Sequence, residues 1–395
     1  MRLNGLERIW VALPKRPIYS GSLDIMLFKL DPNSPKFEVF VRLNEELLHF
    51  LEHAIAGGNF KRSLLTSSDV GQACWNNFKA PRAKNDLTRD KFKKLFVELK
   101  NETQNNRQRL FDTVESHQDL SAFFTAPNRT LLSFLSTNTF NALKALMTHL
   151  YCSTKDLTGV IAGSNGQCIN THFNNFRQKN GLVCLACGME QLAPFRANVE
   201  NENQWRADYD HQLCKSKYPI YAVHPDNLIP LCRVCNQDAK KAKDLFECSN
   251  GLRRFALNPS TEDAQNFLTV EIENLLDPEP KAVLKWNTRN AATLDKLNTW
   301  DDVYEIRNRV EGKYISIVNV IQDEINPSNA QELDVGVQSK ARPVNANTLK
   351  RKEWALWEQK VFSAINAVDK LAFWAQLEFS NEQGEEGGEY IIQGI

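Results

Sequence analysis

The chain reads CLACG at residues 184–188 and DYDHQLCKSKYPIYAVHPDNLIPLCRVCNQDAKKAKDLF at residues 208–246. These two stretches carry two Cys-x-x-Cys pairs, Cys184/Cys187 and Cys232/Cys235. Zn²⁺ prefers four thiolate or imidazole ligands in a tetrahedron, and the two-residue gap lets both sulfurs of a pair reach one ion. The sequence therefore predicts a structural zinc site that joins two segments distant in the chain. Four unrelated buried cysteines are the alternative.

A polar cluster lies between and just after the cysteine pairs, formed by Asp210, His211, Asn227 and Asn236. Hydrolysis of a phosphodiester needs an activated water and a cation on the scissile phosphate. The carboxylate of Asp210 can hold a hard divalent cation, and the imidazole of His211 can take a proton from water near pH 7. Asn236 begins a helix expected over residues 236–246 and can offer an oxygen to the same cation. This cluster indicates a metal-dependent nuclease site.

In this order the residues resemble the HNH endonuclease family, which has a ββα-metal (His-Me finger) fold with zinc knuckles. The matching pattern is Asp210-His211, then Asn227-Leu228, then Cys-x-x-Cys-Asn ending at Asn236 and followed by lysine. The string DYDHQLCKSKYP also resembles a branch of the family that carries DHxLPKSxYP, with Cys214 where that branch has Pro. The resemblance covers about 65 of the 395 residues.

The resemblance implies a role for each residue of the pattern. His211 would be the general base, and Asp210 and Asn236 would hold one catalytic Mg²⁺ or Mn²⁺ ion. Asn227 would order the loop and orient the histidine, while the four cysteines would hold structural zinc. The third motif position is Asn236 rather than His, which suits an oxygen-liking cation.

For several neighbouring residues the sequence leaves more than one role open. Asp208 could replace Asp210 as the metal ligand, and Cys214 could be a fifth ligand or a small buried side chain. His224 is expected to be structural. His172 and Cys168 could form another site, but their placement is expected to be incidental. Trp205 and Tyr209 are expected to be packing residues, with base stacking as the alternative.

Charge composition limits how nucleic acid could be bound. Lys+Arg and Asp+Glu both number 48, so the net charge is zero and any contact with phosphates must use a local patch. Lys240, Lys241 and Lys243 are the expected nucleic-acid-binding residues, although the first lysine falls one position later than in the family. A basic helix expected over residues 86–115 is either a second phosphate contact or a solvated helix face.

The predicted fold class is α+β, with mainly helical flanks and a β-containing N-terminal part around the small zinc-stapled module. Three domains are expected: residues 1–165 for recognition or partner binding, residues 166–255 for the nuclease module, and residues 256–395 as a mostly helical region with a mobile acidic tail. Apolar patterning predicts strands at residues 9–11, 24–30, 37–41, 267–272 and 283–286. It predicts helices at residues 43–56, 86–115, 129–151, 299–325 and 348–378, with a linker at 326–347.

The sequence shows neither a signal peptide nor a long apolar span, so we expect a cytoplasmic protein without membrane contact. The expected function is hydrolysis of DNA, with RNA as an alternative substrate. By analogy, the setting is bacterial restriction or anti-phage defence, with a protein partner in a multi-subunit system. Two alternatives stay open: a zinc-stapled module that binds nucleic acid or protein without catalysis, and a nuclease that only a partner activates.

Overall fold

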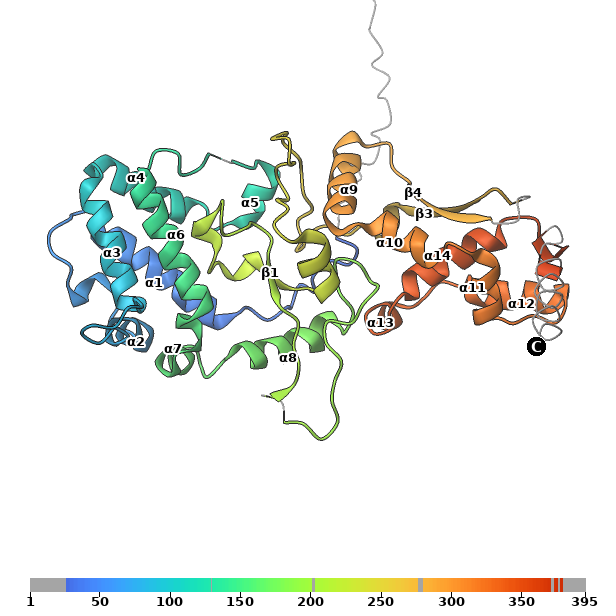
Figure 1. Cartoon of the computed structure of the whole chain (residues 1–395), viewed down its shortest axis with the longest axis horizontal. Helices are drawn as coiled ribbons and strands as arrows, with labels where there is room; N and C mark the ends of the chain where they lie inside the picture. The colour runs from blue at the N-terminus through green and yellow to red at the C-terminus, as the bar shows by residue number, and fades with distance from the viewer. Residues whose placement is uncertain are drawn as a thin grey trace, which may run out of the picture.

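The computed structural model describes residues 26–128, 130–200, 203–275, 280–370, 373–375 and 377–378. Helices dominate the fold, and the described residues also form two separate two-stranded antiparallel sheets, so the fold class is α+β. Along the long axis of the molecule, α1–α7 lie at one end, β1 in the middle, and α9–α14 with β3 and β4 at the other end (Figure 1). Within the described residues, no helix is long and apolar enough to cross a membrane.

The first end of the molecule is built from helices only. Its helices and the α8 helix that follows are α1 (Glu38–Ala54), α2 (Asp69–Asn76), α3 (Thr88–Asn101), α4 (Gln104–Ser116), α5 (Leu120–Thr125), α6 (Thr137–Cys152), α7 (Thr158–Gly163) and α8 (Ile169–Asn180). Side-chain caps begin several of them: Ser68 for α2, Thr103 for α4 and Ser136 for α6.

The prediction of an N-terminal β-containing part is wrong for the described residues. Residues 26–30 form no strand, and residues 38–41 form the first turn of α1. Val39, Phe40 and Leu43 are buried at helical spacing, so packing overrides the β propensity of the run. The strand expected at residues 9–11 lies outside the described residues. The helix expected over residues 86–115 is two helices, because Thr103 caps a new start.

The middle of the molecule contains a short strand pair followed by a short helix. Strand β1 (Tyr209–His211) pairs antiparallel with β2 (Leu228–Pro230), with Asp210 opposite Ile229. The helix η6 (Val234–Lys240) follows directly and is wider than an α-helix, since the Lys241 N–H donates to the carbonyl of Asn236. The helix expected over residues 236–246 is therefore shorter and begins earlier.

The far end confirms both predicted strands, β3 (Leu268–Glu273) and β4 (Lys281–Trp286), which pair antiparallel. Its helices are α9 (Ala291–Tyr304), α10 (Ile306–Lys313), α11 (Ile317–Glu324), α12 (Ala330–Lys340), α13 (Ala346–Leu349) and α14 (Ala355–Asn366). The tail at residues 379–395 lies outside the described residues.

Three predictions about this end are wrong. The helix expected over residues 299–325 is broken at Glu305, whose φ of 56° is left-handed, and again before α11, which Ser316 caps. Thr299 is inside α9 and bonds the carbonyl of Asp295, so it begins no helix. Helix α12 lies within residues 326–347, where a linker was expected, because the side chains of Leu333 and Val337 are buried. The final helix starts later, after Trp354 with φ 61°.

Long-range contacts tie the ends to the middle. The Phe28 N–H donates to the carbonyl of Leu185 at 3.2 Å, and the indole N–H groups of Trp300 and Trp357 donate to the carbonyls of Ala186 and Cys187 at 2.8 and 2.7 Å. The first Cys-x-x-Cys turn is thus enclosed by both flanks. Gly188 follows it with φ 65°, and a Cβ there would lie 2.5 Å from Leu27 Cδ2, so a larger residue would be strained and Leu27 would have to shift.

Candidate functional site

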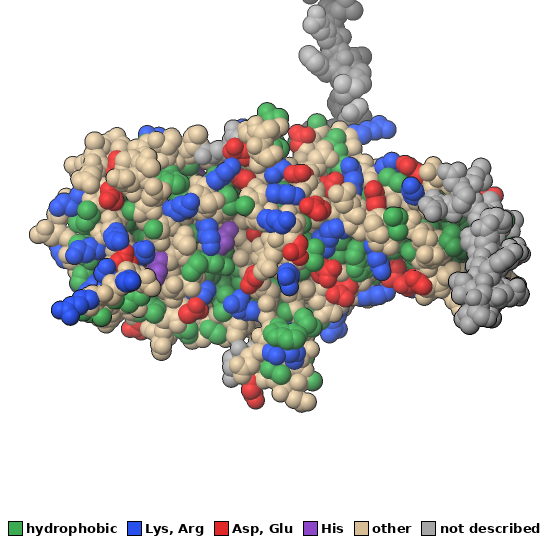
Figure 2. All heavy atoms as spheres, in the orientation of Figure 1, with side chains coloured by type: hydrophobic (Ala, Val, Ile, Leu, Met, Phe, Trp, Pro, Cys, Tyr) green, Lys and Arg blue, Asp and Glu red, His purple; other side chains and the backbone are tan. Residues whose placement is uncertain are grey.

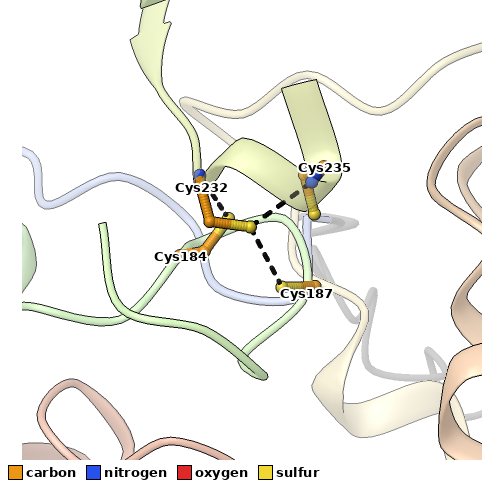
Figure 3. Close-up of side chains that lie close together, drawn as sticks. All are labelled: Cys184, Cys187, Cys232 and Cys235. Carbon is orange, nitrogen blue, oxygen red and sulfur yellow. Dashed lines mark hydrogen bonds between the residues drawn. The ribbon is translucent and has the colours of Figure 1, made fainter. Parts of the chain in front are cut away.

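The four cysteines of the two Cys-x-x-Cys pairs form one buried cluster. Cys184 and Cys187 lie on one loop, Cys232 follows β2, Cys235 lies on η6, and their sulfurs point toward one another (Figure 3). All four Sγ atoms lie within 4.8 Å of one another, and none of the four takes part in a disulfide. Four thiols gathered in this way could hold a metal ion such as zinc.

Hydrogen bonds and one cation support charge on the sulfurs. The Met189 and Cys235 N–H groups donate to Cys187 Sγ and Cys232 Sγ, each at 3.4 Å. Arg309 of α10 places Nη1 3.3 Å from Cys235 Sγ and Nη2 3.8 Å from Cys187 Sγ. Burial works to raise the pKa of Cys187, but the neighbouring thiols and Arg309 hold it well below its usual value. Burial raises the pKa of Cys184 and Cys235 well above the usual value, so Cys187 is the favoured thiolate and a soft metal would have to displace protons from the others.

His211 ends β1 and is only 9% exposed. Its Nε2 lies 3.0 Å from the carbonyl oxygen of Ala222. Since a carbonyl only accepts, Nε2 carries the proton and Nδ1 keeps a lone pair. Burial, and then the nearby charge of Lys215, lower the pKa of His211 to about 3, so the ring is neutral at pH 7. No described residue forms a hydrogen bond with Nδ1, so that nitrogen can accept a proton, but with a pKa of about 3 the ring needs a nearby anion such as a phosphate to become an effective base near pH 7.

Asn227 is fully buried and braces the loop between β1 and β2. Its Oδ1 accepts the Leu213 N–H at 2.7 Å, and its Nδ2 donates to the carbonyls of Tyr221 at 2.8 Å and Leu213 at 3.1 Å. Ala222, which holds the His211 ring, is next to Tyr221 in this loop. Asn227 therefore fixes the position of the carbonyl that orients His211.

Asp210 is buried beside His211, and both of its oxygens have partners. Lys240 Nζ, on η6, donates to Asp210 Oδ1 at 2.5 Å and to the His211 carbonyl at 2.7 Å, while Gln212 Nε2 donates to Asp210 Oδ2 at 2.8 Å. Lys240 is only 3% exposed. The expectation that Lys240 meets nucleic acid is therefore corrected, because its ammonium faces the interior carboxylate instead of an outer face.

The remaining expected ligands and lysines are more scattered. Asn236 is half-buried on η6, and among the described residues its side chain forms no hydrogen bond with Asp210 or His211. Lys241 is exposed at φ 49°. Lys243 Nζ donates to the carbonyl of Asp302 at 2.7 Å and approaches Glu305 at 3.3 Å, so it is tied to the end of α9. Asp208 is exposed and accepts from Gln237 at 2.6 Å.

Two functional neighbours of His211 could not be found from the sequence motif alone. The Tyr151 ring, from the end of α6, meets the His211 ring edge to face with centroids 4.4 Å apart. Lys215 Nζ lies 4.9 Å from the centre of the same tyrosine ring. Lys215 is within the DHQLCKSKYP string, but Tyr151 is far away in the chain and carries no signal. Together they place a cation and an aromatic ring beside the histidine.

The other histidines near this site have structural partners. His172 Nε2 donates to the Pro35 carbonyl at 3.0 Å, and its Nδ1 accepts from the Tyr209 hydroxyl at 2.6 Å. His224 Nε2 donates to the Gln118 carbonyl at 3.1 Å. Both rings join the middle of the molecule to its helical end. A structural role was expected for His224 but not for His172, which was expected to lie there incidentally.

Surface charge on the face drawn in Figure 2 is mixed, with basic and acidic side chains interspersed over most of it. In the helical end, Asp86 neutralises part of the basic surface by pairing with Lys79 at 2.8 Å and with Lys94. These hydrogen bonds lower the pKa of Asp86 to about 2. Basic side chains along α3 are thus partly compensated within the chain.

Comparison of the chain with family models, with curated proteins and with solved structures found no match.

Proposed function

We propose that this protein is a metal-dependent endonuclease that hydrolyses phosphodiester bonds of DNA, with RNA as the alternative substrate. The observation that carries the proposal is His211, a buried neutral imidazole whose Nε2–H is anchored on Ala222 and whose Nδ1 has no hydrogen-bond partner among the described residues. It stands next to the buried carboxylate of Asp210. The order of strand, strand and short helix around these residues agrees with the ββα-metal fold of the HNH family.

The Cys184, Cys187, Cys232 and Cys235 cluster is proposed to hold structural Zn²⁺. Four buried thiols with N–H donors to sulfur and a nearby guanidinium match the ligand preference of zinc. The ion would join the loop after α8 to the start of η6. Because η6 also carries Lys240 and Asn236, the zinc would fix the helix that faces Asp210.

Asp210 and Asn236 are proposed to hold the catalytic Mg²⁺ or Mn²⁺, which would supply positive charge to the scissile phosphate and the leaving oxygen. The contact of Lys240 with Asp210 Oδ1 shows that this carboxylate already faces a cation. A divalent ion at Asp210 would compete with the Lys240 ammonium. The second oxygen stays oriented by Gln212.

In the proposed reaction, His211 takes a proton from the attacking water at Nδ1. The Ala222 carbonyl keeps the ring oriented and stabilises the resulting imidazolium through the Nε2–H. Asn227 holds Ala222 in place through Tyr221. Lys215 contributes positive charge where a phosphate would approach His211. The chain thus supplies the base and its orientation.

The setting is also proposed, by analogy with HNH proteins that have long flanks: a cytoplasmic enzyme of bacterial restriction or anti-phage defence, working with a protein partner. The Lys240–Asp210 pair favours one alternative, a nuclease that stays silent until a partner moves η6. A module that binds nucleic acid or protein without catalysis is the other alternative. In that case the zinc would remain and no cleavage would occur.

A plasmid-cleavage assay in Mg²⁺ or Mn²⁺ tests the proposal. His211→Ala should lower the cleavage rate by about 10²–10⁴-fold, the usual contribution of a general base. His53→Ala removes an exposed histidine of α1 and should leave the rate unchanged. Full activity in His211→Ala would refute the assignment. Absence of cleavage by the wild-type chain, both alone and with partner proteins, would favour the binding module.

A further inference from the structure

A second polar cavity lies outside the Asp210–His211 site. It has a volume of about 720 Å³ and is bounded by the last turns of α8, by residues 181–182 and by the chain just after α13. The Leu182 N–H donates to the Lys350 carbonyl at 2.7 Å, so these segments are in direct contact. Helices α8 and α13 neighbour each other along the same edge of the molecule in Figure 1. The proposed nuclease function uses none of these residues.

The cavity contains a buried arginine without a counter-charge. Arg177 is only 9% exposed and lines the cavity. The centre of the Phe173 ring lies 5.6 Å from Arg177 Cζ, and within the described residues the guanidinium forms no ion pair and no hydrogen bond. Burial lowers the pKa of Arg177 without a compensating carboxylate. Partial desolvation of an unpaired guanidinium is unfavourable, and an anion bound in the cavity would offset it.

The other charged groups of the cavity are mostly positive. Lys179, Lys350 and Arg351 line it together with Arg177, against the single carboxylate of Asp31. Lys350 Nζ lies 3.7 Å from Asp31 and 3.3 Å from the Lys179 carbonyl, so Asp31 is already engaged by one of the lysines. The remaining cations lack a carboxylate within the cavity. This excess suits a multiply charged anion such as a phosphate.

The rim adds a surface for an aromatic ring. Phe195 lines the cavity and is 65% exposed, which is unusual for a phenylalanine. Asn174 and Gln178, on α8, also line it and carry amide groups that can both donate and accept. The volume is within the range of small-molecule sites, roughly 300–1,000 Å³. Phosphate, sugar and base would thus each meet a suitable group.

We propose that this cavity binds a nucleoside phosphate, with the phosphate on Arg177 and the base against Phe195. The ligand is either a free nucleotide or the terminal nucleotide of a strand, since both present the same chemistry. The proposal goes beyond the nuclease function and is independent of it, because the cavity shares no residue with the Asp210–His211 site.

Calorimetric titration of the full chain without added divalent ions tests the site. The probes are AMP, adenosine, inorganic phosphate, and a short oligothymidylate with or without a 5′-phosphate. AMP should bind at least roughly tenfold more tightly than adenosine or phosphate, since its phosphate and its adenosine part both contribute to binding. If the natural ligand is the terminal nucleotide of a strand, the 5′-phosphorylated oligonucleotide should bind more tightly than AMP. If the natural ligand is a free nucleotide, AMP should bind more tightly than the oligonucleotide. Equal binding of AMP and phosphate, or no binding of either nucleotide probe, would overturn the proposal.

Three variants make the assignment specific. Arg177→Met keeps an apolar stem and should weaken AMP binding by roughly 10–100-fold, as expected for a lost charge-assisted contact. Arg289→Met removes an exposed arginine outside the cavity and should have no effect. Phe195→Ala, at an exposed position, should weaken AMP binding several-fold and leave phosphate binding unchanged. Unchanged AMP affinity in both Arg177→Met and Phe195→Ala would contradict the site. Phe195→Ala keeps the test valid if Arg177→Met does not fold.

Discussion

The cysteine cluster and the Asp210–His211 site lie in the same module but are organised differently. In the cluster all four expected ligands converge, with Arg309 as the counter-charge. In the second site Asp210 meets Lys240, while no hydrogen bond joins Asp210 to Asn236 in the described part of the chain. The cluster depends mainly on two tight Cys-x-x-Cys turns, whereas the second site depends on how η6 packs against β1. The short spacing within each Cys-x-x-Cys pair therefore predicts the ligand geometry more reliably than a motif whose ligands come from separate secondary-structure elements.

Removal of one cysteine ligand should have the largest effect. Cys232→Ser should abolish zinc binding and lower the free energy of unfolding by at least about 4 kcal/mol, because metal binding is coupled to folding. Zinc content and thermal unfolding measure this. Cys152→Ser, at an exposed cysteine, is the matched control and should change neither. If Cys232→Ser kept its zinc and its stability, zinc binding by the cluster would not be what stabilises the module.

The second region should respond through the loop that orients His211. Asn227→Ala leaves the Leu213 N–H and the Tyr221 carbonyl without their partner and should cost roughly 2–4 kcal/mol of unfolding free energy. The cleavage rate should fall while zinc content stays unchanged. Asn141→Ala, on the exposed face of α6, should have no effect. Loss of zinc in Asn227→Ala would show that the cysteine cluster and the His211 loop fold as one cooperative unit.

Stability at acid pH should separate His211 from the cysteines. The pKa of His211 is about 3 in the folded chain and about 6.5 when unfolded, so the unfolded state binds more protons between these values. Its contribution to stability is thus present above pH 6.5 and is lost as the pH falls. Between pH 7 and pH 5 the wild type should lose about 2 kcal/mol more than His211→Gln. Parallel curves for the two proteins in denaturant unfolding would contradict the burial of a neutral His211.

Competition at Asp210 should give the smallest effect. Lys240→Met removes the ammonium from Asp210 Oδ1, so the Mg²⁺ concentration for half-maximal cleavage should fall roughly tenfold. Lys241→Met, at the exposed neighbour, should leave this concentration unchanged. An unchanged Mg²⁺ requirement in Lys240→Met would show that Lys240 and the metal do not share Asp210.

Much of the fold and part of the site follow from the sequence alone. The cysteine cluster and strands β3 and β4 were predictable because their signals are local. Residues 38–41 are helical because Phe40 is buried in the core, which β propensity cannot reveal. The breaks at Glu305 and Trp354 depend on left-handed residues of types that seldom adopt that conformation. Tyr151 and Arg309 reach their sites across the fold, so only the tertiary structure identifies them.

The most direct test of two metal sites with different chemistry is anomalous diffraction from crystals of the zinc-loaded chain soaked in Mn²⁺. A zinc peak is expected among the four sulfurs and a separate manganese peak at Asp210, with the Lys240 ammonium moved away from Oδ1. A crystal in which Lys240 stays on Asp210 at saturating Mn²⁺, with no manganese peak there, would contradict the catalytic metal site.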